Sequence, residues 1–243
     1  MDNTMLGKLV KLIVTVPAEW LATLVDLLER LVGESGAEWL KQLRLFLRKE
    51  PTWILPTITK IVKRTLTVWK TINFGGTTTE ALLKSIEAEV KDKEKNEIGK
   101  FARDLTSKLA FVIAPTPGQV GLVVLTPADL GFTSNPRTDA FMTKEFCAEW
   151  SAKNLDGWVI ELCEAEDGPQ LRLQYQDQPK GEVLWIAMER IADSDGDPYV
   201  FGVGRDDGGV RWLGTDWADP SHTWLLGGRL VFRLRKIPSP SAT

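Results

Sequence analysis

The residues best suited to chemistry are concentrated in one short segment of the chain. Residues 210–224 read VRWLGTDWADPSHTW and contain three tryptophans, two aspartates and the only histidine of the 243 residues. A catalytic site, a packed hairpin and a displayed binding surface would each use some of these side chains. The composition favours the binding surface, because tryptophan supplies contact area while aspartate, threonine, serine and histidine supply directional hydrogen bonds.

A catalytic role would depend on His222. An imidazole base needs a nucleophile within reach and an acid that orients it, and Ser221 is its neighbour in sequence only. No serine has the flanking glycines of a nucleophile elbow. We therefore expect a non-enzymatic protein, with a hydrolase that uses scattered carboxylates as a distant alternative.

Metal and cofactor sites are also disfavoured. One histidine and two separated cysteines are too few for a zinc site. The segment from Asp193 to Asp197 alternates oxygen ligands, but Pro198 and Gly204 stand where a calcium loop needs glycine and glutamate. A hairpin turn fits this segment better. The glycines of GVGRDDGG lack the spacing of a nucleotide-binding loop, so we expect no cofactor.

Carboxylates gather after the strand expected at 158–163, as Glu161, Glu164, Glu166 and Asp167. Carboxylates are common, and their spacing alone does not identify a glycosidase pair. We expect them to lie on a solvated strand edge.

The tryptophans of the segment, Trp212, Trp217 and Trp224, are separated by five and seven residues. These spacings fit neither strand alternation nor one helical face, so we expect the rings to point in different directions. Trp212 is predicted to pack in a strand. Trp217 is predicted to lie in a loop as a recognition anchor, and a ring folded back over the sheet remains an open alternative.

Composition limits the class of protein further. Hydrophobic residues make up 43% and charged residues 26%, as in average globular proteins. A net charge of −3 gives no general attraction to nucleic acid, and the basic stretch from Lys41 to Lys70 is interpreted as solvated helix faces. No window has the ~18 apolar residues of a membrane span, although a membrane-surface helix at 6–16 is a minor alternative. The two cysteines form no disulfide framework, which favours the cytoplasm.

The first region, residues 1–66, predicts a helical hairpin domain. Apolar residues recur at helical spacing from Leu21 to Leu31 and from Trp39 to Leu47, with a break at residues 33–36. Stripes of this kind form a core or a self-association face, so residues 6–49 are a candidate homo-oligomer interface. Residues 52–70 predict a short helix or a connector.

The second region, residues 67–237, predicts an α+β domain with helices beside a mostly antiparallel sheet. We expect helices at 80–89, 98–109 and 138–150, and strands at 69–74, 121–126, 158–163, 170–175, 183–191, 199–204, 210–213 and 229–237. Turn sequences such as DSDGDP and LLGGR separate the later strands. The tail, residues 238–243, is expected to be disordered.

Several long motifs carry a resemblance. GPQLRLQY, IAMERIADSDG, VFGVGRDDGG and the terminal RLVFRLRK resemble motifs of an uncharacterised protein family of candidate-phyla bacteria. The resemblance runs from about Trp69 to Lys236 and is weaker over the helical hairpin. Members of that family differ most between the DDGG turn and the terminal strand, and the family has no established activity.

This layout is similar to the variable proteins of diversity-generating retroelements, whose C-type-lectin-like domains hold ligand-contacting residues on a fixed scaffold. The resemblance implies a C-type-lectin-like form of the α+β domain, with RLVFRLRK as a framework strand. It implies contact residues at Arg211, Trp212, Thr215, Asp216, Trp217, Asp219, His222 and Trp224. We therefore predict a binding protein that displays residues 211–224 to a protein or small-molecule ligand. The alternative is a structural or assembly protein that oligomerises through its N-terminal helices.

Overall fold

The computed structural model describes residues 15, 17–33, 35–48, 63–88 and 96–237. The chain divides into two compact units, residues 1–60 and 61–243, so the boundary lies slightly before the predicted one after residue 66. The predicted tail, the segment before Thr15 and most of the predicted connector lie outside the described residues.

The first unit contains two helices that pack against each other, as the sequence predicts. Helix α2 spans Ala18–Val32 and helix α3 spans Gly36–Leu47. A Cβ on Gly36 would lie 2.1 Å from the carbonyl oxygen of Leu31. Glycine is therefore required where the two helices approach at the turn.

The second unit is a mixed α+β domain. Its described helices are α4 (Thr79–Ala88), α5 (Lys100–Thr106), α6 (Thr138–Phe141), α7 (Lys144–Asn154) and α8 (Asp167–Gln174). Its described strands are β1 (Lys70–Phe74), β2 (Asn96–Ile98), β3 (Gly118–Leu125), β4 (Trp158–Glu161), β5 (Val183–Ile186), β6 (Ile191–Ala192), β7 (Pro198–Arg205), β8 (Arg211–Trp217) and β9 (Leu230–Lys236).

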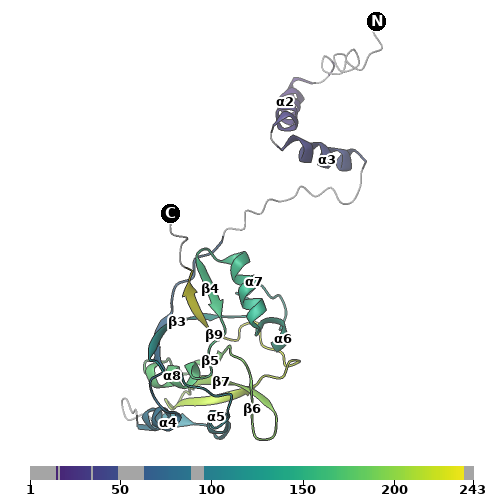
Figure 1. The fold of residues 1–243 in the computed structure, drawn as a ribbon. Coiled ribbons are helices and arrows are strands. Elements are labelled where there is room, and N and C mark those ends of the chain that lie inside the picture. The colour runs from purple at the N-terminus through teal and green to yellow at the C-terminus, as the bar shows by residue number, and fades with distance from the viewer. Residues whose placement is uncertain (1–14, 16, 34, 49–62, 89–95, 238–243) are drawn as a thin grey trace. The chain divides into compact units, whose positions relative to one another are not determined.

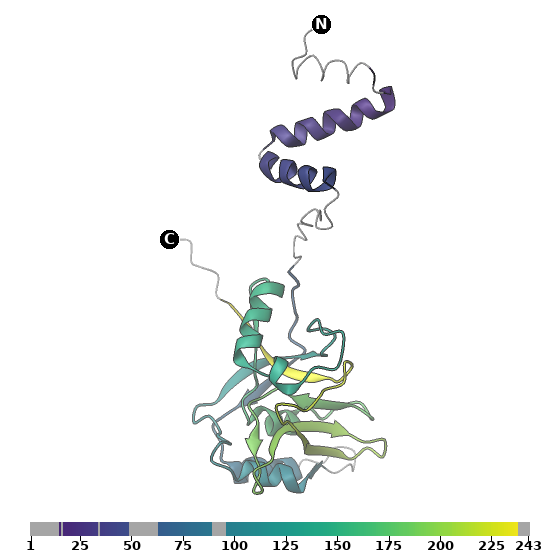
Figure 2. The same cartoon turned by 90° about the vertical axis from the view of Figure 1, so that its right-hand side faces the viewer.

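The strands form one curled mixed sheet in the order β1-β3-β9-β5-β7-β8-β2, with β4 beside β9 and β6 beside β7. Strand β9 pairs antiparallel with β3 and β4 and parallel with β5, so the last strand of the described residues is internal to the sheet. Among the pairings between the named strands only β2–β8 and β5–β9 are parallel. Helices α6 and α7 lie towards one end of this domain, and α4 and α5 lie towards the other (Figure 1, Figure 2).

Continuous apolar runs mark the strands at the centre of the sheet. Strand β7 is buried from Val200 to Gly204, and β9 is buried from Leu230 to Phe232. Strands covered on both faces have no polar face, so their sequences do not alternate. The predictions at these strands are confirmed for that reason.

The predicted strand at 170–175 is wrong, because this segment belongs to α8. Residues Asp167 to Arg172 are all buried, so the helix lacks the one-sided pattern of a surface helix, while Leu171 and Leu173 imitate strand alternation. A Cβ on Gly168 would lie 2.8 Å from Cβ of Phe201, which shows how closely α8 packs on β7.

Two predicted helices are also corrected. The helix expected at 138–150 is two helices, because Thr143 has an extended backbone and its Oγ1 accepts a hydrogen bond from the Phe146 N–H at the start of α7. The helix expected at 98–109 begins only at Lys100. The preceding residues form β2, and the Gly99 N–H donates to the Leu213 carbonyl oxygen.

Candidate functional site

Five aromatic rings form a continuous row in the second unit. The ring centroids of Trp212 and Trp185 are 6.2 Å apart, and those of Trp185 and Trp224 are 6.3 Å apart. His222 follows at 5.2 Å from Trp224, and Trp217 lies 5.8 Å from His222. These separations are typical of tilted and edge-to-face aromatic pairs. We call these five side chains the aromatic row.

Two glycines of β7 make room for the first two rings. Trp185 on β5 pairs in register with Gly202, and Trp212 on β8 pairs with Gly204. A Cβ would lie 2.4 Å from the Trp185 ring at Gly202 and 2.1 Å from the Trp212 ring at Gly204. The two indoles therefore lean over β7 from either side, and each stays partly exposed.

Trp217 is the most exposed ring of the row, with 44% of its surface accessible. It is the last residue of β8, in register with Tyr199, so its predicted place in a loop is wrong. The pairing with β7 extends the strand through a polar sequence that has no strand pattern of its own. The Trp217 N–H donates to the Asp216 carboxylate at 2.9 Å, which fixes the backbone beside the ring.

Two of the eight predicted contact residues are buried and support the surface instead. Trp224 is 3% exposed, and its Nε1 donates to Thr138 Oγ1 at 2.9 Å. Arg211 is 1% exposed, and its Nε donates to the Gln176 carbonyl oxygen at 3.0 Å. Strand alternation puts Arg211 on the face opposite to Trp212, towards the core. Their prediction as ligand contacts is therefore corrected.

The other predicted residues are partly exposed. Thr215 lies in register with Phe201 on β7. Asp219 accepts hydrogen bonds from Ser221 Oγ at 2.5 Å and from the Ser221 N–H at 2.8 Å. These bonds hold the pKa of the Asp219 carboxyl below its ordinary value, with the hydroxyl as the main cause. The Ser221 hydroxyl is thus directed to Asp219, and His222 is flanked by the rings of Trp217 and Trp224.

A distant segment, residues 135–139, holds the loop that follows β8. The Leu226 N–H donates to Asn135 Oδ1 at 3.0 Å, and the Trp224 N–H donates to the Pro136 carbonyl oxygen at 2.9 Å. The Thr138 N–H donates to the His222 carbonyl oxygen at 2.8 Å. The loop is therefore held to residues 135–139 by hydrogen bonds of its backbone and by the buried side chain of Trp224.

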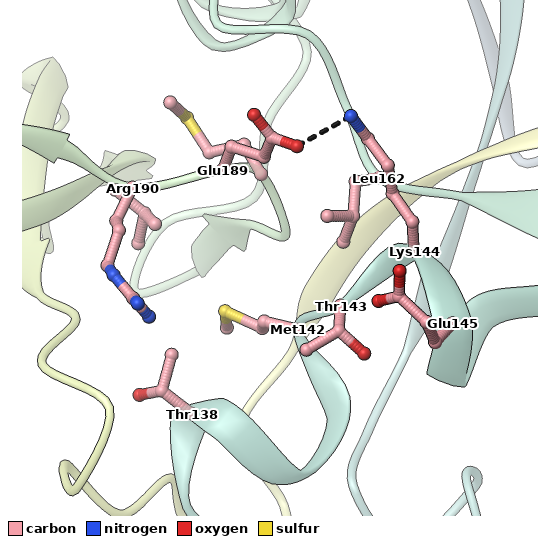
Figure 3. A pocket seen from close by; sticks show the side chains of 10 residues that line it. Thr138, Met142, Thr143, Lys144, Glu145, Leu162, Glu189 and Arg190 are labelled. Atoms are coloured by element: carbon pink, nitrogen blue, oxygen red, sulfur yellow. Dashed lines mark ion pairs between the residues drawn. The ribbon is translucent and has the colours of Figure 1, made fainter.

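A cavity of about 370 Å³ lies next to this anchor (Figure 3). Thr138 lines the cavity and also accepts the hydrogen bond from Trp224, so the cavity and the aromatic row share a wall. Its apolar lining consists of Met142, Leu162, Met188 and Val200, and its polar lining of Thr138, Thr143, Lys144, Glu145, Glu189 and Arg190. Lys144 Nζ and Glu189 Oε1 form an ion pair at 2.6 Å.

Sequence reasoning missed Trp185, Thr138 and Arg190. The glycines at 202 and 204, which alternate within a predicted strand, were a signal of a close approach by another group. Only the strand pairing identifies that group at Gly202 as Trp185. Thr138 and Arg190 carried no local signal, because only tertiary structure brings them together.

The carboxylates expected on a solvated edge are partly buried. Asp167 is fully buried and accepts two hydrogen bonds from Arg233, at 2.6 and 2.9 Å. Burial raises the pKa of the Asp167 carboxyl, against the lowering effect of Arg233. Glu166 is 1% exposed and accepts from the N–H groups of Gly75 and Ala114, each at 2.8 Å. The prediction fails for these two residues, which tie α8 to neighbouring segments.

Both cysteines are buried free thiols. Burial raises the pKa of Cys147 to about 12 and raises the pKa of Cys163 well above its ordinary value. The thiolate is the reactive form, so these side chains are poor nucleophiles at neutral pH.

Within the described ranges, no group of three or more His, Cys, Asp or Glu side chains is arranged to hold a metal ion. None of the described helices is long and apolar enough to span a membrane. Comparison of the chain with protein-family models, curated proteins and solved structures gave no match.

Proposed function

We propose that this chain is a non-enzymatic binding protein that presents the exposed part of the aromatic row and the residues from Asp216 to His222 to a ligand. The aromatic row is the observation that carries the proposal. Trp185, Trp212 and Trp217 keep part of their surface in solvent, although full burial of such large rings would stabilise the fold. Aromatic surface that is left exposed beside polar side chains is typical of recognition sites.

The scaffold beneath the row supports this proposal. The rings of Trp185 and Trp212 rest on the central strand β7, and Trp224 anchors the following loop in the core. A surface held in place before binding loses less conformational entropy when a ligand is captured. We place the protein in the cytoplasm, where reducing conditions suit the two unpaired thiols.

The resemblance to retroelement variable proteins, with their C-type-lectin-like domain, is part of the proposal. If the chain is such a variable protein, Arg211 and Trp224 belong to the fixed framework because they are buried. The diversified positions are then the partly exposed ones, namely Trp212, Thr215, Asp216, Trp217, Asp219 and His222. Sequencing the surrounding locus tests this. We expect a reverse transcriptase and an imperfect repeat of codons 210–236 whose mismatches fall at adenines and omit codons 211 and 224. A locus without such a repeat would leave an undiversified binding surface.

Binding itself is tested by screening the protein on a glycan array and against a displayed peptide library. For any ligand recovered, we expect Trp217→Ala to weaken binding tenfold or more, because it removes the most exposed ring of the row. Leu225→Ala is the matched control, since Leu225 is 70% exposed on the adjoining loop but is not part of the row. Equal losses in the two variants, or binding that neither variant affects, would contradict the proposed surface.

Assembly through the first unit is the second candidate. Val25, Leu28 and Val32 on α2 are 52%, 57% and 87% exposed, and their spacing places them on one face of the helix. Light scattering of the full chain tests this candidate. Assembly predicts an oligomer that Leu28→Glu converts to a monomer, while Glu29→Gln beside it has no effect. A monomeric wild-type chain would eliminate this function.

A further inference from the structure

The cavity beside the aromatic row has the chemistry of a small-ligand site. Its volume, about 370 Å³, lies within the range of known ligand pockets, roughly 300–1,000 Å³. Met142 and Leu162 are each 8% exposed and give the lining its accessible apolar surface, while Met188 and Val200, at 2% and 0% exposed, present almost no surface to the cavity. Methionine side chains are flexible and polarisable, and they adapt to apolar ligands of different shapes.

Arg190 is the cation of this lining that could bind an anion. Its guanidinium group points towards Thr138 and lies beside Met142 (Figure 3). Within the part of the chain that the structure describes, no hydrogen bond and no ion pair satisfies this group. The other cation of the lining, Lys144, is already paired with Glu189.

The acidic side chains near Arg190 do not pair with its guanidinium group. Asp219 lies close enough for an electrostatic effect, but within the described residues it forms no hydrogen bond or ion pair with Arg190, and its Oδ1 accepts both hydrogen bonds from Ser221. Glu189 holds Lys144, and Glu145 is an exposed side chain at the start of α7. The guanidinium group therefore remains available for a planar anion, which it can bind through two parallel hydrogen bonds.

We propose that this cavity binds an apolar molecule that ends in a carboxylate, with the apolar body against Met142 and Leu162 and the carboxylate on Arg190. This chemistry is shared by a small aryl or alkyl acid and by the C-terminus of a peptide that ends in an apolar residue. The proposal is independent of the function assigned to the aromatic row, because it uses none of the exposed rings.

The four methionines of the chain make a direct test available. Met142 and Met188 line the cavity, while Met1 and Met5 belong to the N-terminal segment and serve as internal references. The full chain, labelled at the methionine methyl groups, is titrated with 4-phenylbutyrate and with N-acetyl-Ala-Phe. We expect the Met142 and Met188 methyl resonances to shift with a saturable dependence on at least one acid. The tighter of the two acids identifies the source of the carboxylate.

Neutral probes and two variants measure how much the ion pair between the ligand carboxylate and Arg190 contributes to binding. 4-Phenylbutan-1-ol and the amide of N-acetyl-Ala-Phe should bind at least tenfold more weakly than the matching acids. Arg190→Gln should weaken binding of the acid by a similar factor, while Arg103→Gln, which removes an equal charge from α5, should change it less than twofold. The absence of a shift at Met142 and Met188 with either acid would overturn the proposal. Neutral probes that bind as tightly as the matching acids would also overturn it, and so would an Arg190→Gln variant that binds the acid as tightly as the wild type does.

Discussion

At the scale of single residues, the aromatic row depends on two glycines, whose lack of a side chain leaves room for the rings. Gly202 and Gly204 leave the surface of β7 free for the indoles of Trp185 and Trp212. The same strand turns Phe201 and Val203 to its other face, where both are fully buried. One strand therefore supplies both the core and the support of the exposed rings.

Gly204→Ala tests this arrangement. The new methyl group would lie 2.1 Å from the Trp212 ring, so the ring must move, and we expect a loss of about 1–3 kcal/mol in the free energy of unfolding. Urea denaturation followed by tryptophan fluorescence measures the loss. Gly227→Ala is the control, because a Cβ there meets nothing within 4 Å and should change stability by less than about 0.5 kcal/mol. Similar stability of the two variants would show that Trp212 does not rest on Gly204.

Arg233 and Arg235, both on β9, allow a buried and an exposed ion pair to be compared by matched substitutions. Arg233→Gln leaves the buried Asp167 carboxylate without its partner, and we expect a loss of about 3–5 kcal/mol in thermal or urea unfolding. Arg235→Gln breaks an exposed pair with Glu161 and should change stability by at most about 1 kcal/mol.

The loss in Arg233→Gln should also depend on pH. Burial raises the pKa of Asp167 in the folded state above its value in the unfolded chain, and the variant removes the group that lowers it. The folded variant therefore binds this proton more tightly than the unfolded variant does. Its deficit relative to the wild type should be largest near neutral pH and should shrink as the pH falls towards the ordinary carboxyl pKa of about 4. A deficit that grows on acidification would reverse this assignment.

At the scale of elements, the break between α6 and α7 has a local cause. The extended backbone of Thr143 interrupts the helix between Thr138 and Trp150, and its hydroxyl oxygen caps α7. We expect Thr143→Ala to lower the free energy of unfolding by about 1 kcal/mol. Thr143→Ser keeps the accepting oxygen and should recover most of the loss in the same denaturation experiment. Equal loss in the two variants would assign the effect to packing of the threonine methyl group.

At the scale of the whole molecule, the described hydrophobic core belongs to the second unit. Its cluster of buried residues runs from Ile72 to Leu234. Removal of residues 1–60 should therefore leave the Tm of the second unit within about 3 °C of that in the full chain, because the shortened chain keeps every residue of this core. Differential scanning calorimetry measures this difference. A large fall in Tm would show that the first unit stabilises the second.

Patterns that follow from local geometry were readable in the sequence. The helical hairpin, the central apolar strands and the hairpin turn at Asp193–Asp197 were predicted, and the Asp193 carboxylate accepts from the N–H groups of Asp195 and Asp197 as such a turn requires. Each of these features depends on residues that are close together in the chain, so their spacing is enough to reveal them.

Other features were decided only by the tertiary structure. Burial of α8 removed the periodic signal that would have identified it as a helix, and pairing with β7 made a strand of residues up to Trp217. The aromatic row needs β5, β7, β8 and the following loop at once, and the cavity joins Thr138 to Arg190 across the fold. Side chains so distant in sequence are brought together by packing of the core, because the free energy of burial depends on contacts that no local spacing encodes.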